Sequence, residues 1–284
     1  MRPEIKFHCS EEGNFKNDLH QVSAFIYTDY FIEAHNHDFY EMNIVMKGTG
    51  THQIEEACFK VKAGDVFVIP PMTIHAYYDT SDLDVYHILL QKRFVADNES
   101  EAVHVKGYLQ LMEIEPFLRR HFSEAMFLHL TQNQLLQLKS ELKFIESGGV
   151  FDGDDYVPLK NHTTWKIIYW LSYLLFEQMN SGEKKSSNKY EYAVLQALEY
   201  IHQSYGEKIT IETLCRKTFL SRSTFLRSFD TICGMTPAQY LNDYRCKKAI
   251  EMMEHTDLSK TEIAHSCGFY DLSHMERMTK RLVS

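Results

Sequence analysis

A pattern of two short amphipathic segments separated by a tight turn occurs twice in the last hundred residues of this chain. The first copy spans 211–229, and the second, shorter copy spans 262–278. In each copy the first segment has apolar residues at helical spacing, and the second begins with hydroxyl or acidic residues that cap helices. The pattern predicts an all-α C-terminal domain with two helix-turn-helix units.

Two capping boxes mark further helix starts in this region. Thr236 is followed by Pro237 and, three residues after the threonine, by Gln239; Ser259 and Glu262 form the second box. We expect the helix after Thr236 to join the two units rigidly. Its apolar stripe consists of Tyr240, Leu241, Tyr244, Ala249, Met252 and Met253.

The outward face of each second segment carries side chains that can read DNA. Arginine can bridge O6 and N7 of guanine, and serine or threonine can reach bases or phosphates. Two such helices could read two successive major grooves, ideally about 34 Å apart. Any single segment could be an ordinary solvated helix face, but the repeat, the caps and the linking helix favour DNA. The predicted contacts are Ser221, Arg222, Ser223, Thr224 and Arg227 in the first unit, and Ser273, His274 and Arg277 in the second.

The core of the first unit is expected to contain Phe225, Ser228 and Phe229, together with Leu214 and Leu220. Ser221 is the expected N-cap of its second helix. In the second unit either Asp271 or Ser273 begins the corresponding helix.

The charge distribution is compatible with nucleic-acid binding in residues 190–284 but not in the rest of the chain. The net charge is −9, but residues 190–284 carry 12 basic and 12 acidic side chains, while 1–189 carry 18 and 27. A neutral domain does not bind DNA as a polyelectrolyte, so base readout and dimerisation would carry more of the affinity.

The preceding sequence divides into a strand-rich part and a helical part. Residues from about 20 to 95 show short Val-, Ile-, Phe- and Tyr-rich runs with turn signals at 47–50, 62–65 and 70–71, which predict a β-sandwich or small barrel. From about 106 to 180 apolar residues recur at helical spacing. A polar break is expected at 148–158 and a linker at 181–189. The predicted domains are 1–105, the helical segment 106–180, the linker, and 190–284. The apolar residues of the helical segment include Leu135, Leu138, Leu142, Ile145, Trp165, Ile168, Leu171 and Leu175.

A histidine cluster lies in the strand-rich part. His35 and His37 share a face if they lie on a strand, Glu41 follows, and His75 would come from a facing strand. Three imidazoles and a carboxylate could hold a divalent metal, or they could line a pocket for a small polar ligand. Nearby aromatic residues suit a sugar-stacking pocket: Phe39, Tyr40, Tyr77 and Tyr78. The expected effector contacts are His35, His37, Tyr40, Glu41, His75 and Tyr77; the expected metal ligands are His35, His37, Glu41 and His75.

Composition narrows the class of protein. The sequence contains no run of about 18 apolar residues, so no membrane-spanning helix is predicted. The N-terminus lacks the apolar stretch of a signal peptide. The six cysteines are scattered, so neither a disulfide framework nor a cysteine-rich zinc site is predicted. We expect a cytoplasmic protein.

These motifs resemble the AraC/XylS family of bacterial transcription regulators over nearly the whole chain. The family pattern Gly-x-Thr/Ser-Pro-x-x-Tyr matches 234–240, and Ile-Ala-x-x-x-Gly-Phe matches 263–269; Arg245 and Ala249 also fit. The N-terminal part is similar to the cupin sensor of that family, through His35-x-His37-x(3)-Glu41-x(6)-Gly48, the run 64–71 and His75. The matched histidines and glutamate also fit the metal-ligand positions of cupin enzymes, although sensor cupins of this family usually work without a catalytic metal.

The resemblance implies an α+β protein with a cupin-type β-barrel sensor, a helical dimerisation segment and a double helix-turn-helix domain. It implies a DNA-binding regulator that responds to a small molecule. A subset with a long helical insert controls sugar use, so a carbohydrate is the expected effector. A homodimer is expected, and activation would require contact with RNA polymerase.

The chain departs from the family pattern at its end. Met275 and Thr279 stand where the second recognition helix usually has aromatic residues, and the usual second Gly-x-x-Pro-x-x-Tyr helix is absent. The second unit is therefore expected to be truncated and less stable.

Two other hypotheses remain open from the sequence. One is a metal-dependent cupin enzyme, such as an isomerase or dioxygenase, with an appended helical domain. The other is a degenerate sensor on a protein that binds DNA constitutively.

Overall fold

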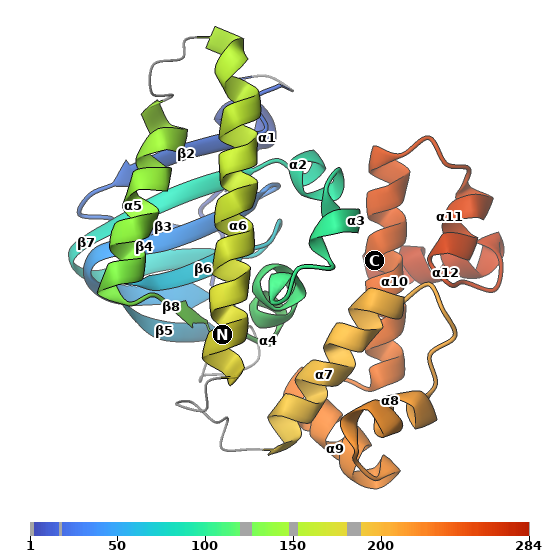
Figure 1. The fold of residues 1–284 in the computed structure, drawn as a ribbon. Helices are drawn as coiled ribbons and strands as arrows, with labels where there is room; N and C mark the ends of the chain where they lie inside the picture. Colours follow the sequence, from blue (N-terminus) through green and yellow to red (C-terminus); the bar gives the residue numbers. More distant parts are fainter. Residues whose placement is uncertain (1–2, 17–18, 120–126, 148–152, 181–188, 284) are drawn as a thin grey trace. The chain divides into compact units, whose positions relative to one another are not determined.

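The computed structural model describes residues 3–16, 19–119, 127–147, 153–180 and 189–283, and its ribbon is drawn in Figure 1. The chain forms two compact units, Met1–Glu183 and Lys184–Ser284. The boundary falls within the predicted linker 181–189, which apart from Lys189 lies outside the described residues. The residues predicted to form the polar break are described only from 153 onwards.

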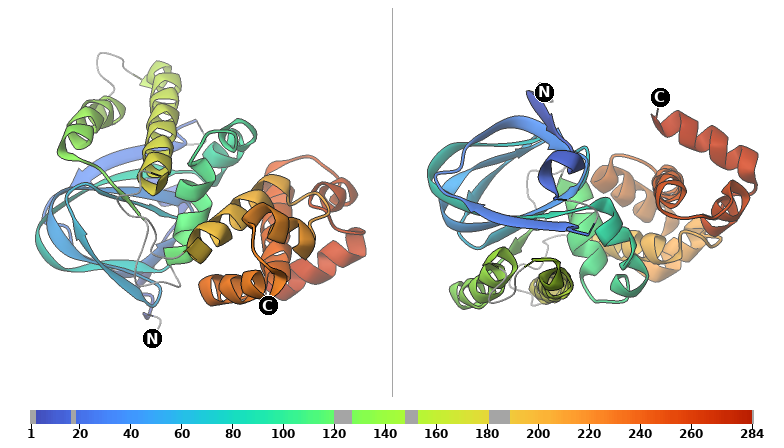
Figure 2. Two further views of the ribbon diagram at one scale, coloured as in Figure 1. Left: turned by 60° about the horizontal axis from the view of Figure 1, so that its bottom comes forward. Right: turned by 90° about the horizontal axis from the view of Figure 1, so that it is seen from above.

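The first unit contains a sheet of eight strands that curls around a shared interior (Figure 2). One half-sheet has the order β2-β7-β4-β6-β8 and the other β1-β3-β7-β4-β5, because the long strands β4 and β7 run through both halves. Every pair is antiparallel except β1 with β3. The pairings among the described strands follow an open path, so the predicted cupin-type barrel is curled without being closed by hydrogen bonds. The strands are β1 (Phe7–Cys9), β2 (Val22–Tyr27), β3 (Ile32–His37), β4 (Tyr40–Ile54), β5 (Ala57–Lys62), β6 (Asp65–Ile69), β7 (His75–Leu90) and β8 (Leu128–His129).

The bend in the two long strands is made at Gly48. This glycine has a φ of +76°, and the β4–β7 register shifts three times between Val45 and Thr51. A Cβ atom at this position would lie 2.1 Å from the backbone oxygen of Asp82. Residues 47–50 were predicted to end a strand, and this prediction was wrong: β4 continues through them, because a glycine that permits a turn also permits a bulge. The predicted turns at 62–65 and 70–71 are confirmed.

Two long helices cover the outer face of the half-sheet that contains β2. Helices α5 (Gln132–Ser147) and α6 (Val157–Asn180) pack against each other and against β2, and the hydroxyl of Tyr86 donates to the carbonyl of Leu142 at 2.8 Å. Residues 40–45, 65–69 and 85–90 are therefore buried on both faces of their strands. The apolar stripes of 135–145 and 165–175 are buried in the same unit, so they are not free to bind a partner.

Shorter helices complete the first unit. A five-residue π-helical turn, η1, runs directly into α4, which contains Pro116 and ends at the buried Arg119. Proline has no N–H to donate and clashes with the carbonyl four residues earlier, which a wider turn relieves. These elements are α1 (Glu11–Asn14), α2 (Lys92–Ala96), α3 (Glu99–Ala102), η1 (Gln110–Ile114), α4 (Glu115–Arg119) and the 3₁₀ helix η2 (Gly153–Tyr156).

The second unit is helical and contains both predicted helix-turn-helix units. Helices α8 and α9 pack on α7, while α11 and α12 pack on α10, which joins the two pairs. Both predicted capping boxes, at Thr236 and Ser259, are present. Across the described residues, no helix combines the length and apolarity needed to cross a membrane. The helices are α7 (Lys189–Ser204), α8 (Ile211–Thr218), α9 (Arg222–Cys233), α10 (Pro237–His255), α11 (Lys260–Ser266) and α12 (Leu272–Val283).

Replacing Gly48 by alanine should destabilise the first unit strongly. The methyl group would collide with backbone rather than with a flexible side chain, and the left-handed conformation alone costs roughly 1–2 kcal/mol for a non-glycine residue. Both tryptophans lie in α6, so urea unfolding followed by tryptophan fluorescence reports this unit. Gly13→Ala is the matched control, because its Cβ would meet nothing closer than 3.8 Å. Equal unfolding midpoints for the two variants would contradict the role given to Gly48.

Candidate functional site

The buried carboxylate of Glu41 is surrounded by three imidazoles. Its Oε2 atom lies 3.0 Å from Nε2 of His37 and 3.2 Å from Nε2 of His75, and its Oε1 atom lies 2.5 Å from Nδ1 of His87. All four side chains are almost completely buried. A charged carboxylate in such a place is stable only where polar or charged partners replace the lost water.

The strand registers bring these groups together. His35 and His37 lie two residues apart on β3 and share a face, and His35 is paired directly with His75 of β7. The rings of His35 and His75 have centroids 4.1 Å apart. His75 thus comes from the neighbouring strand, and the predicted grouping of His35, His37, Glu41 and His75 is present.

Two further histidines lie in the same interior and were missed in the sequence. His87 is paired with Asn43 across β7 and β4, and His52 stacks on Tyr77 with ring centroids 4.0 Å apart. His87 lies alone in an apolar part of β7, and His52 lies alone in a polar part of β4. A single histidine in a strand is also the pattern of an ordinary core residue, so neither was predicted to belong to the site. Only the bend that turns one half of β4 toward the other brings His52 near the rest.

Several polar atoms of this interior have no hydrogen-bond partner among the described residues. They are Nε2 of His87, both ring nitrogens of His52 and Oδ1 of Asn43; Nε2 of His37 and of His75 lie at ion-pair distance from Glu41 without hydrogen-bond geometry. The amide of Asn43 donates only to the hydroxyl of Tyr77, at 3.2 Å. Buried groups of this kind are normally satisfied, so their concentration around one carboxylate marks a place for a polar ligand or for water.

Burial and close contacts set the charges of these groups. Burial alone would raise the pKa of Glu41, but the contacts with His37, His75 and His87 outweigh it and hold that pKa well below its usual range. Burial lowers the pKa of His35 to about 4 and lowers the pKa values of His52 and His75. At neutral pH the interior therefore presents the carboxylate of Glu41 and the neutral imidazole of His52, whose two ring nitrogens can donate and accept.

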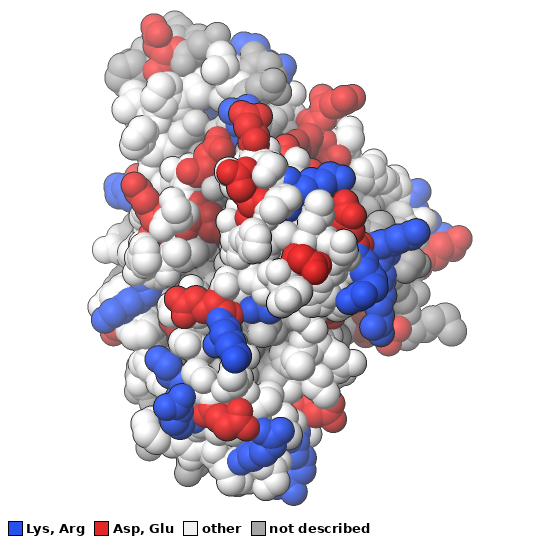
Figure 3. Space-filling model, turned by 90° about the vertical axis from the view of Figure 1, so that its right-hand side faces the viewer, with Lys and Arg blue, Asp and Glu red and all other residues white. Residues whose placement is uncertain are grey.

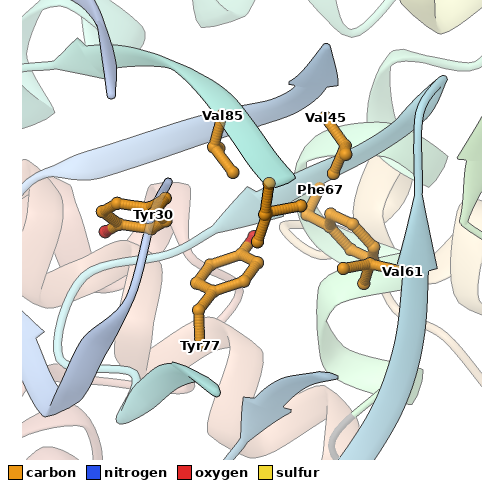
Figure 4. Packing of buried hydrophobic residues seen from close by; sticks show 7 residues of the cluster. Tyr30, Val45, Val61, Phe67, Tyr77 and Val85 are labelled. Carbon is orange, nitrogen blue, oxygen red and sulfur yellow. The ribbon is translucent and has the colours of Figure 1, made fainter. Parts of the chain in front are cut away.

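The other part of the interior is apolar. Figure 4 shows side chains from the loop after β2 and from β4, β5, β6 and β7 pointing toward one another. Tyr77 belongs both to this cluster and to the stack with His52, so it forms the border between the two parts. The apolar cluster consists of Tyr30, Val45, Val61, Phe67, Tyr77, Leu83 and Val85.

The aromatic residues predicted around the histidines divide between the two faces of the sheet. Phe39 stacks on His37 with ring centroids 4.4 Å apart. Tyr40 directly precedes Glu41 on β4, so its side chain leaves the opposite face of the strand and is not brought to the cluster. Tyr78 likewise leaves the face opposite to Tyr77, and its hydroxyl contacts the sulfur of Cys58.

Three of the four predicted metal ligands could share an ion. His35, Glu41 and His75 each offer a ligand atom within 4.8 Å of the others, the one such group among the described residues. His37 is outside this group. The donor set of two imidazoles and a carboxylate suits a first-row divalent metal.

A buried ion pair adjoins the sheet. Arg119 lies 3.0 Å from Glu115 through Nε and Oε1, and its guanidinium also donates to the carbonyl of Val68 and lies over the ring of Phe67. Burial raises the pKa of Glu115 to about 6. This pair was not predicted, because the helical pattern from about 106 to 180 does not mark α4 as a separate helix.

The first helix-turn-helix unit has the predicted geometry. The Ser221 hydroxyl accepts from the backbone N–H of Thr224, and Phe225, Ser228 and Phe229 face the core. Arg222, Ser223 and Arg227 are exposed and Thr224 is half-buried. Arg222 lies 2.6 Å from Glu212 of α8, so a base contact by Arg222 would first require this surface ion pair to open. Leu214 is buried as expected, whereas Leu220 is half-buried.

The second unit is built around a small core of its own. Asp271, not Ser273, caps α12, since its carboxylate accepts from the N–H of His274 at 2.7 Å. Ser273 and Arg277 are exposed and His274 is half-buried. The core formed with α10 consists of Cys246, Ala249, Ile263, Ala264, Cys267, Phe269 and Met275.

The linking helix α10 is fixed to α7 and to the segment that directly follows α7. Arg245 donates through Nε to the carbonyl of Tyr205 and through Nη2 to that of Glu207, both at 2.7 Å, and His202 contacts the hydroxyl of Tyr240 at 2.6 Å. Most of the predicted apolar stripe is buried, but Met253 is exposed. On the face drawn in Figure 3, Lys and Arg side chains form separate small groups with Asp and Glu between them.

Comparisons with known proteins match both units. A model of the AraC-like ligand binding domain matches residues 22–142, and a model of a helix-turn-helix domain matches residues 214–284. The HTH-type transcriptional activator RhaS of Salmonella arizonae is 27% identical over 250 residues, which cover 87% of this chain and 83% of the relative. RhaS of Salmonella typhimurium is 26% identical over 249 residues, with the same coverage.

Among solved structures, the DNA-binding domain of AdpA in complex with a target DNA is 31% identical, with a TM-score of 0.30; the match covers 34% of this chain and 85% of that one. The two matched models lie on the two units in the order that the sequence predicts, one on the curled sheet and one on the paired helix-turn-helix units. The chain carries an AraC-like ligand binding domain and a helix-turn-helix domain, and it is a DNA-binding transcription regulator similar to members of the AraC/XylS family.

Proposed function

We propose that this regulator binds a small carbohydrate in the interior of its curled sheet and thereby changes how its helix-turn-helix units engage DNA. The observation that carries this proposal is the set of buried polar atoms without partners around Glu41. Sensing also requires that ligand binding differ between two arrangements of the protein, since an effector shifts an equilibrium only by its differential affinity.

The chemistry of the interior suits a polyol. Each sugar hydroxyl both donates and accepts. The imidazole of His52 can do both, Nε2 of His87 faces the same interior, and Glu41 and the oxygen of Asn43 accept. The apolar face of a sugar ring can lie on an aromatic side chain, as Tyr77 provides at the border of the apolar cluster. The RhaS relatives are named transcriptional activators, which supports activation by this chain through contact with RNA polymerase.

His52→Phe separates ligand binding from folding. The phenyl ring keeps the stack on Tyr77, and the histidine loses no hydrogen bond because neither of its nitrogens has a partner. We expect unchanged or higher stability without ligand, because an unsatisfied buried polar group is removed. A screen of neutral monosaccharides by thermal unfolding should find one that stabilises the unmodified protein, by about 2.7 kcal/mol at a hundred times its dissociation constant. That stabilisation should disappear in His52→Phe.

The exposed His104 provides the matched control, and His104→Phe should keep the ligand response. If His52→Phe binds the sugar as tightly as the unmodified protein, the ligand does not use this interior. If no monosaccharide stabilises the protein, the carbohydrate class is wrong.

A divalent metal at His35, Glu41 and His75 is the second candidate, because these residues alone group for an ion among the described ones. Metal content measured on protein purified without chelator decides between the two. A stoichiometric ion that is lost in the His75→Ala and Glu41→Gln double variant would favour the metal and reopen the hypothesis of a cupin enzyme. Ion content below a tenth of the protein concentration would argue against the metal and against the cupin enzyme. The family relationship supports a regulator without catalytic activity.

The recognition helices are proposed to be α9 and α12. Ser221, Arg222, Ser223, Thr224 and Arg227 would contact DNA from α9, and Ser273, His274 and Arg277 from α12. Arg227 is exposed and has no ion-pair partner among the described residues, while Arg222 is held by Glu212. We also propose that the protein is cytoplasmic, because a regulator must reach chromosomal DNA.

Arg227→Ala should weaken binding to a duplex selected by the unmodified protein from a randomised library. Loss of one bidentate base contact costs about 1–3 kcal/mol, or roughly 5- to 150-fold in affinity. Arg222→Ala should have a smaller effect, because the unmodified arginine must first leave Glu212, and Glu212→Ala should raise affinity slightly. Fluorescence anisotropy measures all three. Unchanged affinity in both arginine variants would show that α9 is not a recognition helix.

A homodimer is proposed to form through exposed residues of α5 and α6. The predicted apolar stripes are buried within the unit, but Leu136, Leu159 and Tyr173 remain exposed on these helices. Leu136→Lys should shift the sedimentation equilibrium toward monomer. Phe31→Lys, at a similarly exposed apolar residue outside α5 and α6, is the control and should leave the equilibrium unchanged. A protein that is monomeric at every concentration, with or without DNA, would contradict the proposal.

A further inference from the structure

Two aromatic side chains of the second unit are far more exposed than any other large hydrophobic side chain described. Phe219 is 88% exposed and Tyr270 is 87% exposed, whereas the next in order, Leu136 in the first unit, is 62% exposed. Single exposed apolar residues are common on proteins. Two nearly complete exposures at related places are not explained by that general rule.

The two residues lie in the turns of the two helix-turn-helix units, at neighbouring rather than equivalent positions. Phe219 is the C-cap of α8 and lies two residues before the N-cap Ser221, and Tyr270 lies directly before Asp271, which caps α12. Each turn also contains a less exposed hydrophobic residue, the half-buried Leu220 in the first and the buried Phe269 in the second. Each turn therefore presents one aromatic ring to the solvent beside the N-terminus of a recognition helix.

Folding alone does not favour Phe219. Its φ is +54°, a left-handed conformation that costs roughly 1–2 kcal/mol for a residue with a Cβ atom. In the second unit the residue at this place, directly before the core-facing Phe269, is Gly268 with a φ of +73°. A strained conformation that exposes a phenyl ring is best explained by something the ring contacts outside the fold.

The surroundings of Phe219 indicate a polyanionic partner. Arg216 and Lys217 form the last turn of α8, and Arg222, which is paired with Glu212, opens α9; all three are exposed. When the N-terminal half of a recognition helix enters a major groove, the turn before it lies beside the sugar–phosphate strand. There an aromatic ring can pack on the apolar face of deoxyribose, while the neighbouring cations pair with phosphates.

We propose that Phe219 and Tyr270 pack against the deoxyribose–phosphate backbone at the edges of two major grooves entered by α9 and α12. The hydroxyl of Tyr270 would donate to a phosphate oxygen. These contacts rest on the proposed recognition helices and add to them a positioning contact in each unit that carries no base specificity.

Phe219→Gly tests the proposal directly. Glycine relieves the backbone strain, as Gly268 does in the second unit, so the variant should unfold at an equal or higher urea concentration. Its affinity for the selected duplex should nevertheless fall by roughly 3- to 10-fold, up to about the 1.4 kcal/mol that corresponds to a tenfold change. Binding to a duplex of unrelated sequence should fall by the same factor, because backbone contacts do not read bases.

Companion variants keep the test decisive. Tyr270→Phe should lose part of the affinity and Tyr270→Ala more. Phe219→Asn, which also tolerates the left-handed region, replaces Phe219→Gly if that protein does not fold. Tyr192→Ala, at an exposed tyrosine of α7, is the control and should leave affinity unchanged.

Unchanged affinity in Phe219→Gly and Tyr270→Ala, with affinity lost in Arg227→Ala, would overturn this inference and leave the recognition helices in place. Unchanged affinity in all three would reject the recognition helices themselves. Unchanged affinity with reduced transcription from a reporter would overturn the inference in another way, because the rings would then contact a protein.

Discussion

The close approach of two backbones at Gly48 and Asp82 determines the shape of the first unit. Strands β4 and β7 have 15 and 16 residues. In a flat pair of that length, the residues at one end would lie far from those at the other end. Because a glycine lets the strands come into contact and bulge, each strand bends and its halves face one another. Glu41 and His52, eleven residues apart on β4, thereby line one interior. The same bend leaves one half-sheet free to be covered by α5 and α6 on its outside.

That interior combines two kinds of packing that usually exclude each other. The apolar cluster around Tyr77 provides the burial that stabilises the unit, while the histidines beside it hold a carboxylate whose lost hydration must be replaced. Contacts with three imidazoles accomplish this for Glu41, but His52 and Asn43 remain with unsatisfied atoms. Such atoms lower stability when the protein is empty. A ligand that forms hydrogen bonds with these atoms removes that cost, and the removed cost contributes to its binding free energy.

Local signals explain which features were predictable from the sequence. The capping boxes at Thr236 and Ser259, and the N-cap Ser221, involve residues three positions apart, so the helices of the second unit followed from the sequence alone. The group of His35, His37 and Glu41 also follows from short spacing. The role of His87 does not, because its partner Glu41 is 46 residues away and the strand around it is apolar.

The continuation of β4 through residues 47–50 was unpredictable for a similar reason. A glycine-rich tetrapeptide favours a turn by its own conformational freedom, and only the distant Asp82 backbone makes it a bulge. The outward position of Tyr40 was within reach of the sequence, because alternation along a strand separates it from Glu41 once β4 is known to begin there.

The second unit must achieve DNA affinity without a large electrostatic contribution. Its 12 basic and 12 acidic residues balance, and Arg222 is already paired with Glu212. Counterion release is then small, and affinity depends on how well several modest contacts are held in place together. Helix α10 holds these contacts in place. Tyr240 fixes it to α7, Arg245 fixes it to the segment after α7, and residues of α10 complete the core around Met275. When each contact with DNA is weak, binding two DNA sites at once raises the overall affinity most, because the second site is bound intramolecularly. For such a protein, a ligand that alters only the placement of its DNA-binding units can change occupancy greatly without touching the DNA surface.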